Sequence, residues 1–495
     1  MKDPKVLLIY PPPRLLPIET PRPDGSLGML YLAGALRQIG IEADLLDTSI
    51  GGPNDTLEDT FYRNVPLENG LTQIGMSWER IAEAVADYDI VGIHSNHTSQ
   101  TKASFTVAEL VKQVNPETLV VAGGISARAL RHRFVNHGCF DLICTSEGER
   151  TIQAVAQRFR QGQGYEGIPG TLGNPPSFYR NLDELPFPTW DKLLLEKYEQ
   201  ISAPHGVDMT GQHYRYQNLM TSRGCPFQCA YCHISKERFN RSEDTGNVGD
   251  LRLKSVDRVL QEIEILQSLG VTKIFIEDDS LLAKKARIIN IFTAIQGKNL
   301  LIADVNGVNL VHLFKRNATG LEPDKEYLEL LFGAGLRQMV FPVESGSQRV
   351  LDKYATGKLT LETMDVINLV RVAKSVGMMC PINMMIGFPD ETEQEMMMSI
   401  ELSKRLIDAG TDYVTFFIPI PFPGSQLYDI AIENGHLRPD FDTDIMNYKN
   451  GVMENTTVPK ERIVALRDWA WSTVNSKEHV AKRLQESMGA RWLEV

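Results

Sequence analysis

The sequence predicts an α/β protein in three parts: a doubly wound parallel sheet, a partial (β/α)6 barrel and a small C-terminal helical region. Two separate stretches of the chain alternate short apolar strands with helices of roughly 10–15 residues, which is the pattern of parallel βαβ units. A segment rich in Pro and Gly lies between them and marks a domain boundary. We therefore expect domains at 1–161, 217–435 and 436–495, with a linker at 162–216.

The first domain contains five predicted strands. The first, at 6–10, is stopped by three prolines, and the following helix at 28–39 ends at Gly40, a residue that commonly follows a helix C-terminus. Short crossover helices between the strands imply parallel pairing. The strands are predicted at 6–10, 43–46, 89–93, 118–124 and 141–144. Ligands of such sheets bind at the carboxyl ends of the strands.

The second domain repeats a strand and a helix six times. In the helix at 256–269, Ser255 is a preferred N-cap, and Val259, Ile263 and Leu266 recur on one face. Six such units predict a curved sheet or partial barrel with its chemistry at the strand C-termini. The strands are predicted at 218–221, 273–277, 301–305, 338–343, 381–386 and 413–418. The last part of the chain is predicted to be helical and includes a helix at 460–474.

The composition is that of an ordinary globular protein and argues against several partners. The 495 residues carry 51 basic and 63 acidic side chains, and the net charge of −12 argues against binding to nucleic acid. No apolar run approaches the roughly 18–20 residues that span a bilayer, and the N-terminus has no apolar signal core. We therefore expect a cytoplasmic protein with no membrane span and no nucleic-acid partner.

Three of the six cysteines lie in one short loop. Cys225, Cys229 and Cys232 have a C-x3-C-x2-C spacing directly after the first predicted barrel strand. A structural zinc site needs four ligands, and no second pair of Cys or His accompanies this loop. Three thiolates on a [4Fe–4S] cluster leave one iron free to bind a small molecule. The loop is therefore predicted to bind a [4Fe–4S] cluster; a structural zinc site and buried thiols are the alternatives.

This loop, at the end of the first strand of a six-unit barrel, resembles that of the radical S-adenosylmethionine (SAM) superfamily. The resemblance implies that SAM chelates the open iron and that an electron donor such as flavodoxin or ferredoxin reduces the cluster. SAM is then cleaved to a 5′-deoxyadenosyl radical. Segments after the later strands also resemble the family: Glu277-Asp278-Asp279, Asn306-Gly307, Glu344-Ser345-Gly346-Ser347, Gly387-Phe388-Pro389-Asp390-Glu391-Thr392 and Pro421-Phe422-Pro423-Gly424-Ser425.

The same resemblance implies SAM contacts at the strand ends. Acidic side chains there can accept hydrogen bonds from the ammonium or ribose hydroxyls of SAM, a serine can donate to its carboxylate, and glycines let the backbone approach. Tyr231, between two cluster cysteines, can face the adenine. Asp278, which is adjacent to Glu277, is an alternative candidate for the same contact with SAM. The predicted SAM-binding residues are Tyr231, Glu277, Glu344, Ser345, Gly346 and Gly387.

The N-terminal sheet is similar to the Rossmann-like cobalamin-binding domain of cobalamin-dependent radical SAM enzymes. The segments that carry this resemblance are Tyr10-Pro11-Pro12-Pro13, Leu27-Gly28-Met29-Leu30-Tyr31-Leu32-Ala33, Ala122-Gly123-Gly124 and Ser146-Glu147-Gly148-Glu149. They imply cobalamin contacts at Ser95, Gly123, Gly124 and Glu147, although the two glycines can also form a simple turn. A D-x-H-x-x-G loop is absent after the first strand. His94 and His97 lie near a strand end. They can either reach the cobalt or serve as ordinary hydrogen-bonding residues.

The leading hypothesis is a cobalamin-dependent radical SAM methyltransferase that methylates an unactivated carbon through methylcobalamin and a 5′-deoxyadenosyl radical. A cyclase or ring-rearranging enzyme with the same cofactors and a non-catalytic iron–sulfur protein are alternatives. A methylthiotransferase is disfavoured, because those enzymes use additional N-terminal cysteines and none precedes Cys139. A small molecule, a lipid and a peptide all stay open as the substrate, and the sequence assigns no catalytic residue beyond the cofactor ligands.

Overall fold

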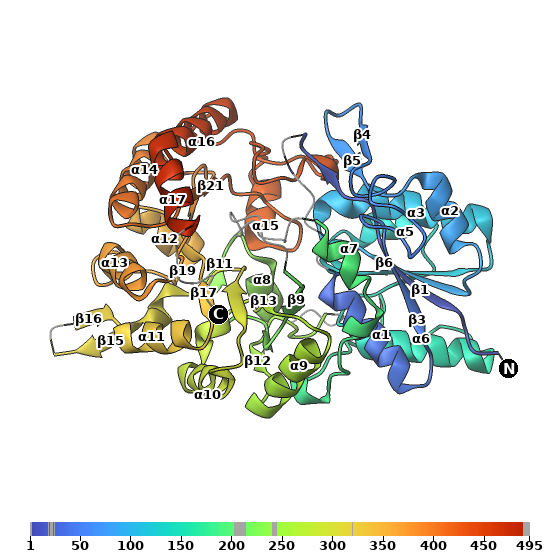
Figure 1. Cartoon of the computed structure of the whole chain (residues 1–495). Coiled ribbons are helices and arrows are strands. Elements are labelled where there is room, and N and C mark those ends of the chain that lie inside the picture. Colours follow the sequence, from blue (N-terminus) through green and yellow to red (C-terminus); the bar gives the residue numbers. More distant parts are fainter. Residues whose placement is uncertain are drawn as a thin grey trace. The chain divides into compact units, whose positions relative to one another are not determined.

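The computed structural model of the chain describes residues 2–17, 19, 23, 25–201, 214–239, 245–318 and 320–488. The chain forms two compact units (Figure 1). Unit 1 consists of Met1–His205, Phe239–Val248 and Asp442–Met446, and unit 2 consists of Gly206–Arg238, Gly249–Phe441 and Asn447–Val495. Each unit contains a parallel sheet, which confirms the predicted α/β fold class. Parts of the predicted linker and C-terminal region, 202–213 and 489–495, lie outside the described residues.

Unit 1 is built on a five-stranded parallel sheet. Its strands are β1 (Val6–Tyr10), β3 (Ala43–Asp47), β6 (Ile90–His94), β7 (Leu119–Gly123) and β8 (Leu142–Ile143), and each matches a predicted strand to within one residue at either end. The spatial order is β3-β1-β6-β7-β8. This order reverses between β1 and β6, and ligands of doubly wound sheets bind beside such a switch point, at the carboxyl ends of the strands.

Helices cover both faces of this sheet (Figure 1): α1 (Leu27–Gln38), α2 (Trp78–Val85), α3 (Thr101–Val114) and α6 (Glu149–Gln161). Val6 and Leu8 pack with α1 and α6 in one apolar cluster. Leu7 and Ile9 pack with α2 and α3 in a second cluster. Because successive side chains of a strand point to opposite faces, the continuous apolar run of β1 fills both cores.

Unit 1 also contains elements that the sequence did not predict. The short helices are α4 (Ile125–Ala129), α5 (Arg131–His137) and α7 (Leu195–Glu199), and a small antiparallel sheet contains β2 (Arg14–Leu15), β5 (Thr72–Ile74) and β4 (Asn64–Pro66). Strands of two or three residues are too short to show an alternating pattern in the sequence. Because β2 follows β1 closely in the chain, this small sheet begins next to the carboxyl end of β1.

Unit 2 is an open barrel of parallel strands. Its strands are β9 (Tyr216–Leu219), β13 (Lys273–Ile276), β14 (Leu301–Asp304), β17 (Leu336–Gln338), β18 (Phe341–Glu344), β20 (Ile382–Met385) and β21 (Val414–Phe417). The predicted fourth strand is split: β17 pairs with β14, and β18 pairs with β20, so one segment joins the two halves. Within the part of the chain that the structure describes, no ladder joins β21 to β9, as expected for a partial barrel.

Helices follow the barrel strands in turn. They are α8 (His233–Phe239), α9 (Val256–Ser268), α10 (Lys285–Ile295), α11 (Lys325–Gly333), α12 (Gln348–Tyr354), α13 (Val366–Val376), α14 (Glu393–Asp408) and α15 (Gln426–Glu433). The C-terminal helices are α16 (Lys460–Val474), which has its predicted bounds, and α17 (Lys477–Met488). An unpredicted hairpin is formed by β15 (Phe314–Asn317) and β16 (Gly320–Pro323). Among the described residues, no helix has the length and apolar character that crossing a membrane requires.

Candidate functional site

The cysteine motif lies in the loop that follows β9. Two short ladders hold it: β10 (Ser222–Arg223) with β12 (Arg252–Leu253), and β11 (Gln228–Cys229) with β19 (Ala355–Thr356). Inside the loop, the Ser235 hydroxyl accepts from the Cys229 amide at 2.9 Å and donates to the Phe227 carbonyl at 3.1 Å. These contacts fix the backbone that carries the three thiols.

A buried carboxylate holds the start of this loop. Asp278 is fully buried just after β13 and accepts from the amide and the hydroxyl of Thr221, both at 2.5 Å. It also accepts from the Ser222 hydroxyl at 2.6 Å. The neighbouring Asp279 accepts from the Gly224 amide at 2.9 Å. The sequence left Asp278 as a competitor of Glu277 for SAM, whereas in the structure its carboxylate positions the cysteine loop.

Replacing Gly224 by Ala is expected to impair cluster assembly. Gly224 has a φ of +81°, and a Cβ there would lie 2.3 Å from the carbonyl oxygen of Asp250. The left-handed backbone costs an alanine about 1 kcal/mol, and the clash forces the loop away from its neighbour. We expect iron bound per protein after anaerobic reconstitution to fall at least about twofold.

Gly40→Ala is the matched control for this substitution. Gly40 has a φ of +77°, but no heavy atom lies within 4 Å of a Cβ built there. This variant therefore carries the same backbone cost without the clash, and its iron content should equal that of the wild type. Equal iron content in both variants would mean that close packing at Gly224 does not shape the cluster site.

The thiols of the motif are shielded from water. Cys229 is buried, and Cys225 and Cys232 are partly buried. Burial raises the pKa of each thiol, that of Cys232 to about 12. Iron–sulfur ligands are thiolates, so cluster binding must release protons from this loop. Among the described residues, no three His, Cys, Asp or Glu side chains are spaced to hold one metal ion; a [4Fe–4S] cluster instead takes one thiolate for each of three irons.

Three polar side chains meet next to the cysteine loop. Glu344, 5% exposed at the end of β18, accepts from the Tyr231 hydroxyl at 2.6 Å and from Lys358 Nζ at 2.9 Å. Burial alone would lower the pKa of Lys358, but the Glu344 carboxylate and the Cys229 thiol raise it above its usual range. The structure thus brings together two predicted SAM-binding residues, and it adds a buried cation that the sequence did not point to.

Glu277 lies at the same end of the barrel and has a different partner. Its Oε1 accepts from Asn218 Nδ2 at 2.6 Å, and the Asn306 amide group donates to its backbone carbonyl at 2.9 Å. Asn218 is buried in β9, and its Oδ1 has no hydrogen-bond partner within the described part of the chain. A buried amide oxygen without a partner fits a site that a ligand completes. A contact between Glu277 and SAM stays a prediction.

Ser345 and Gly346 contact α14. The Ser345 hydroxyl lies 3.2 Å from the Ser399 hydroxyl and accepts from the Ser347 amide at 3.1 Å. A Cβ at Gly346 would lie 2.5 Å from the carbonyl oxygen of Met398. The glycine therefore allows a close approach between the strand end and α14, where the sequence suggested room for a ligand. Their contacts with SAM stay predictions.

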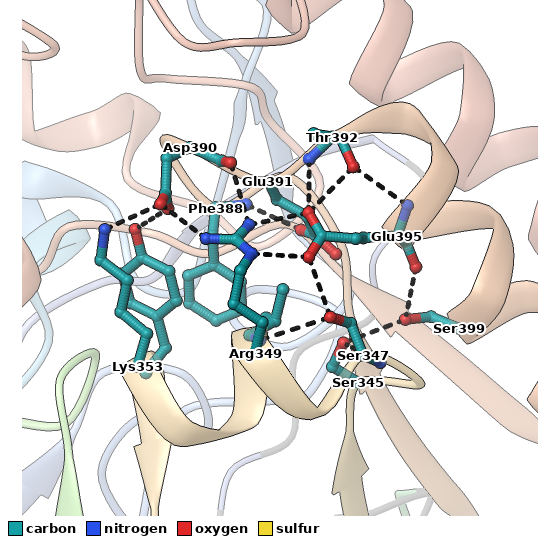
Figure 2. Close-up of polar contacts among 12 residues, drawn as sticks. Ser345, Ser347, Arg349, Lys353, Phe388, Asp390, Glu391, Thr392, Glu395 and Ser399 are labelled. Atoms are coloured by element: carbon teal, nitrogen blue, oxygen red, sulfur yellow. Dashed lines mark hydrogen bonds and ion pairs between the residues drawn. The ribbon is translucent and has the colours of Figure 1, made fainter.

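A polar network joins the segments that follow β18 and β20 (Figure 2). Arg349 on α12 donates to Asp390 at 2.8 Å and to both carboxylate oxygens of Glu395 at 2.7 Å. Thr392 and Glu395 form a capping box at the start of α14. The Ser347 hydroxyl adds a bond of 2.9 Å to Glu395. These two segments of the barrel rim are thereby held in one arrangement.

Gly387 lies in the same segment and is constrained by packing. It has a φ of +102°, and a Cβ there would lie 2.5 Å from Ile463 on α16. Its amide and that of Phe388 donate to the Glu391 carboxylate at 2.7 and 3.0 Å. Burial raises the pKa of Glu391 to about 7. The conformation and the neighbouring helix both require glycine here; a contact with SAM stays a prediction.

Replacing Arg349 by Met is expected to make the free energy of unfolding less dependent on pH in the acid range. Hydrogen bonds from Arg349 hold the pKa of Glu395 well below its usual range. Burial would raise the pKa of Asp390, but hydrogen bonds from Lys353, Tyr354 and Arg349 lower it to about 2. A lowered carboxyl pKa stabilises the fold above the ordinary pKa of about 4, and that stability is lost as the pH falls toward 2. Because Arg349 is half-exposed, we expect a loss of about 1 kcal/mol at pH 7 that shrinks as the pH falls from about 4 to about 2, measured by unfolding at a series of pH values.

Arg438→Met is the matched control for Arg349→Met. Arg438 also forms a two-bond pair, with Asp440 at 3.0 and 2.8 Å, but both side chains are largely exposed. Solvent screens such a pair, so its loss should leave stability unchanged at every pH. If both variants lost the same stability, the effect would come from general surface charge and not from the network in Figure 2.

The switch point of the unit 1 sheet carries buried polar atoms without a partner. Ser95 Oγ and His94 Nδ1 have no hydrogen bond within the described residues. The ring centroids of His94 and Tyr10 lie 4.7 Å apart, so the ends of β6 and β1 meet here. Burial lowers the pKa of His94 to about 3, so its imidazole is neutral at pH 7. Buried polar atoms without a protein partner are rare and indicate that another group binds.

The two glycines at the end of β7, Gly123 and Gly124, differ in their surroundings. A Cβ at Gly123 would meet nothing closer than Cys144 at 3.9 Å, so space is open beside it. Gly124 has a φ of +114°, and a Cβ there would lie 2.5 Å from the Ser95 carbonyl oxygen. Glu147 accepts from the Tyr179 amide at 3.2 Å. The structure brings Ser95 and both glycines to one edge of the sheet; the cobalamin contacts of all four predicted residues stay predictions.

Comparison with known proteins identifies both units. Residues 219–403 match the radical SAM superfamily, and residues 25–156 match the B12 binding domain. The chain combines a radical SAM domain with a B12 binding domain. A radical SAM domain uses a [4Fe–4S] cluster and SAM, and a B12 binding domain binds cobalamin, which confirms the three cofactors expected from the sequence.

The amino-acid sequence of this chain is similar to those of other proteins along most of its length. An uncharacterised methyltransferase of Pyrococcus horikoshii is 29% identical over 451 residues, which cover 88% of this chain and 85% of that protein. Cytidylyl-2-hydroxyethylphosphonate methyltransferase of Streptomyces wedmorensis is 27% identical over 491 residues, 91% of this chain and 85% of that protein. The solved structure of the radical SAM methyltransferase TsrM from Kitasatospora setae, with cobalamin and a [4Fe–4S] cluster bound, shares the fold, with a TM-score of 0.62 and 16% identity over 88% of this chain and 79% of that one.

The residues of the radical SAM protein fit these cofactors. The cysteine loop offers three shielded thiols that become ligands on losing their protons. The barrel rim beside it offers the Glu344 carboxylate and the amide oxygen of Asn218, which has no partner among the described residues. In unit 1, Ser95 Oγ lacks a partner in the described part of the chain, and Gly123 leaves open space, as a bulky ligand at the switch point requires.

Proposed function

We propose that this protein is a methyltransferase that moves a methyl group from SAM by way of cobalamin to an unactivated carbon of its substrate. The observation that carries the proposal is that the similarity to two proteins named methyltransferases extends through both cofactor units, over 88% and 91% of the chain. When bound, the cluster and SAM supply the radical that removes a hydrogen atom, and cobalamin carries the methyl group.

A carbon acceptor is supported by the chemistry of the cofactors. Nitrogen and oxygen atoms with lone pairs can attack the methyl group of SAM directly, without a radical. An unactivated carbon has no lone pair and must first lose a hydrogen atom, which is what a reductively cleaved SAM achieves. A chain that carries both a radical SAM domain and a B12-binding domain therefore suits carbon better than a heteroatom.

The residues of the chain contribute binding, orientation and the exclusion of water. The Glu344 carboxylate, held by Tyr231 and Lys358, is a fixed negative group beside the cysteine loop. Asp278 positions the start of that loop. In unit 1, the Ser95 hydroxyl and the space beside Gly123 suit the buried part of cobalamin. Preorganised groups of this kind lower the entropic cost of bringing reactants together.

The first half of the proposed reaction can be tested without knowing the substrate. Protein reconstituted with the cluster and cobalamin would be reduced with titanium(III) citrate and mixed with SAM that carries a deuterated methyl group. We expect mass spectrometry to find the deuterated methyl on cobalamin together with S-adenosylhomocysteine. Formation of 5′-deoxyadenosine without methylation of cobalamin would contradict methyl transfer and favour a cyclase or ring-rearranging enzyme.

A further inference from the structure

A segment that follows the barrel in the sequence belongs to unit 1. Asp442–Met446 is part of unit 1 and contains the short 3-10 helix Thr443–Ile445. This helix contacts α3 and a second 3-10 helix, Thr98–Gln100. Both of these elements follow β6 in the chain. The segment therefore lies beside the loop that leaves one of the two strands at the switch point.

Asp444 is the centre of this contact. Its side chain is 2% exposed, and its Oδ2 accepts from Arg14 Nη1 at 3.0 Å and from Asn69 Nδ2 at 3.1 Å. Lys102 Nζ lies 3.5 Å from the same oxygen. Arg14 follows β1, and Lys102 follows β6. One carboxylate oxygen thus joins the segments on the two sides of the switch point.

One further polar atom of each residue, Arg14 and Asp444, has no partner in the part of the chain that the structure describes. Asp444 Oδ1 and Arg14 Nε are both buried, and neither has a hydrogen bond within the described residues. A buried donor or acceptor without a partner costs stability, so native proteins rarely keep one that neither water nor a ligand satisfies. Arg14 and Asp444 are bonded to each other through other atoms, so the pair carries one buried donor and one buried acceptor that the described residues leave without a partner.

We propose that Arg14 and Asp444 bind a carboxamide side chain on the rim of the corrin ring of cobalamin. A primary carboxamide has a carbonyl oxygen that accepts and an NH2 group that donates, which complements Arg14 Nε–H and Asp444 Oδ1. The corrin ring carries such carboxamides around its edge. Ser95 Oγ and His94 Nδ1, which also lack partners among the residues that the structure describes, lie at the same carboxyl edge of the sheet. The proposal rests on cobalamin binding by unit 1, which the proposed function also requires.

Replacing Asp444 by Asn tests the acceptor. The substitution keeps the size of the side chain but removes its charge and one acceptor oxygen. We expect the Kd of the apo-protein for hydroxocobalamin, measured by equilibrium dialysis, to rise at least about tenfold. Asp442→Asn is the matched control, because Asp442 lies in the same segment and pairs with Lys102 at 2.7 Å, but has no buried oxygen without a partner. Its Kd should change less than about threefold.

Modified cobalamins separate recognition from folding. In cobalamin monocarboxylates, one rim carboxamide is hydrolysed to a carboxylate. We expect the wild type to bind one of these isomers at least about tenfold more weakly than the others, because that carboxylate faces Asp444 and cannot donate to it. Asp444→Asn should recover affinity for the same isomer, since the asparagine amide can donate to a carboxylate. A general loss of folding cannot improve the binding of one isomer.

Arg14→Lys tests the donor and decides the proposal if Asp444→Asn does not fold. Lysine keeps a cation for the ion pair but has no Nε–H, so the Kd for hydroxocobalamin should again rise about tenfold. The proposal is overturned if Asp444→Asn binds cobalamin as the wild type does, if Asp442→Asn loses as much affinity, or if the wild type treats all isomers alike. Failure of the wild type to bind cobalamin would instead contradict the proposed function.

Discussion

Replacing Cys225 by Ala is expected to abolish the reductive cleavage of SAM. Cys225, Cys229 and Cys232 are the predicted ligands of three irons, and a cluster with two protein thiolates is not held in place. We expect iron content and the visible absorbance of the cluster to fall close to background after anaerobic reconstitution. The formation of 5′-deoxyadenosine from SAM under dithionite should fall by a factor of about a hundred or more.

Cys139→Ala is the control for this experiment. Cys139 is partly buried in unit 1, outside the motif, and no ladder of the barrel includes it. Its replacement removes one thiol from the chain but should leave iron content and SAM cleavage unchanged. If the Cys225→Ala protein still produced 5′-deoxyadenosine at the wild-type rate, that result would contradict the radical mechanism.

The architecture could be predicted because its signals are local. The apolar run of β1, stopped by three prolines, and the helix α16 are each encoded within their own segment, and both have the predicted bounds. The split of the fourth barrel strand into β17 and β18 was not predicted, since it depends on which neighbour each half pairs with. Pairing partners that are distant in the chain leave no periodic pattern in a single sequence.

The candidate site shows the same division between local and distant information. The cysteine spacing is visible within eight consecutive positions, so the loop was identified at once. Lys358 was missed, because nothing in its own segment indicates that it meets Glu344 and Tyr231, the latter 127 residues away. Asp278 and Glu277 are adjacent in the sequence, and only the fold shows that Asp278 faces Thr221, 57 residues away, and that Glu277 faces Asn218.

Replacing Lys358 by Met is expected to destabilise the barrel strongly. Lys358 and Glu344 are 13% and 7% exposed in their side chains and lie 2.9 Å apart. Removing one partner of a buried ion pair leaves the other charge in an apolar surrounding, which costs about 3–5 kcal/mol. We expect the opening free energy of amides in β18 to fall by about 3 kcal/mol, measured by hydrogen exchange on apo-protein, with unit 1 peptides unchanged.

The double variant Glu344→Gln/Lys358→Met isolates the cause of this loss. It removes both charges, and the glutamine can still accept a hydrogen bond from the Tyr231 hydroxyl, so most of the lost protection in β18 should return. If the double variant were as unstable as Lys358→Met, the lysine would act through packing of its aliphatic stem instead of its charge. Because both outcomes are read on apo-protein, they report on the electrostatics of the barrel rim independently of SAM. A recovered β18 would therefore establish that Lys358 stabilises this part of the barrel through its charge, by pairing with the Glu344 carboxylate beside the cysteine loop before any cofactor binds.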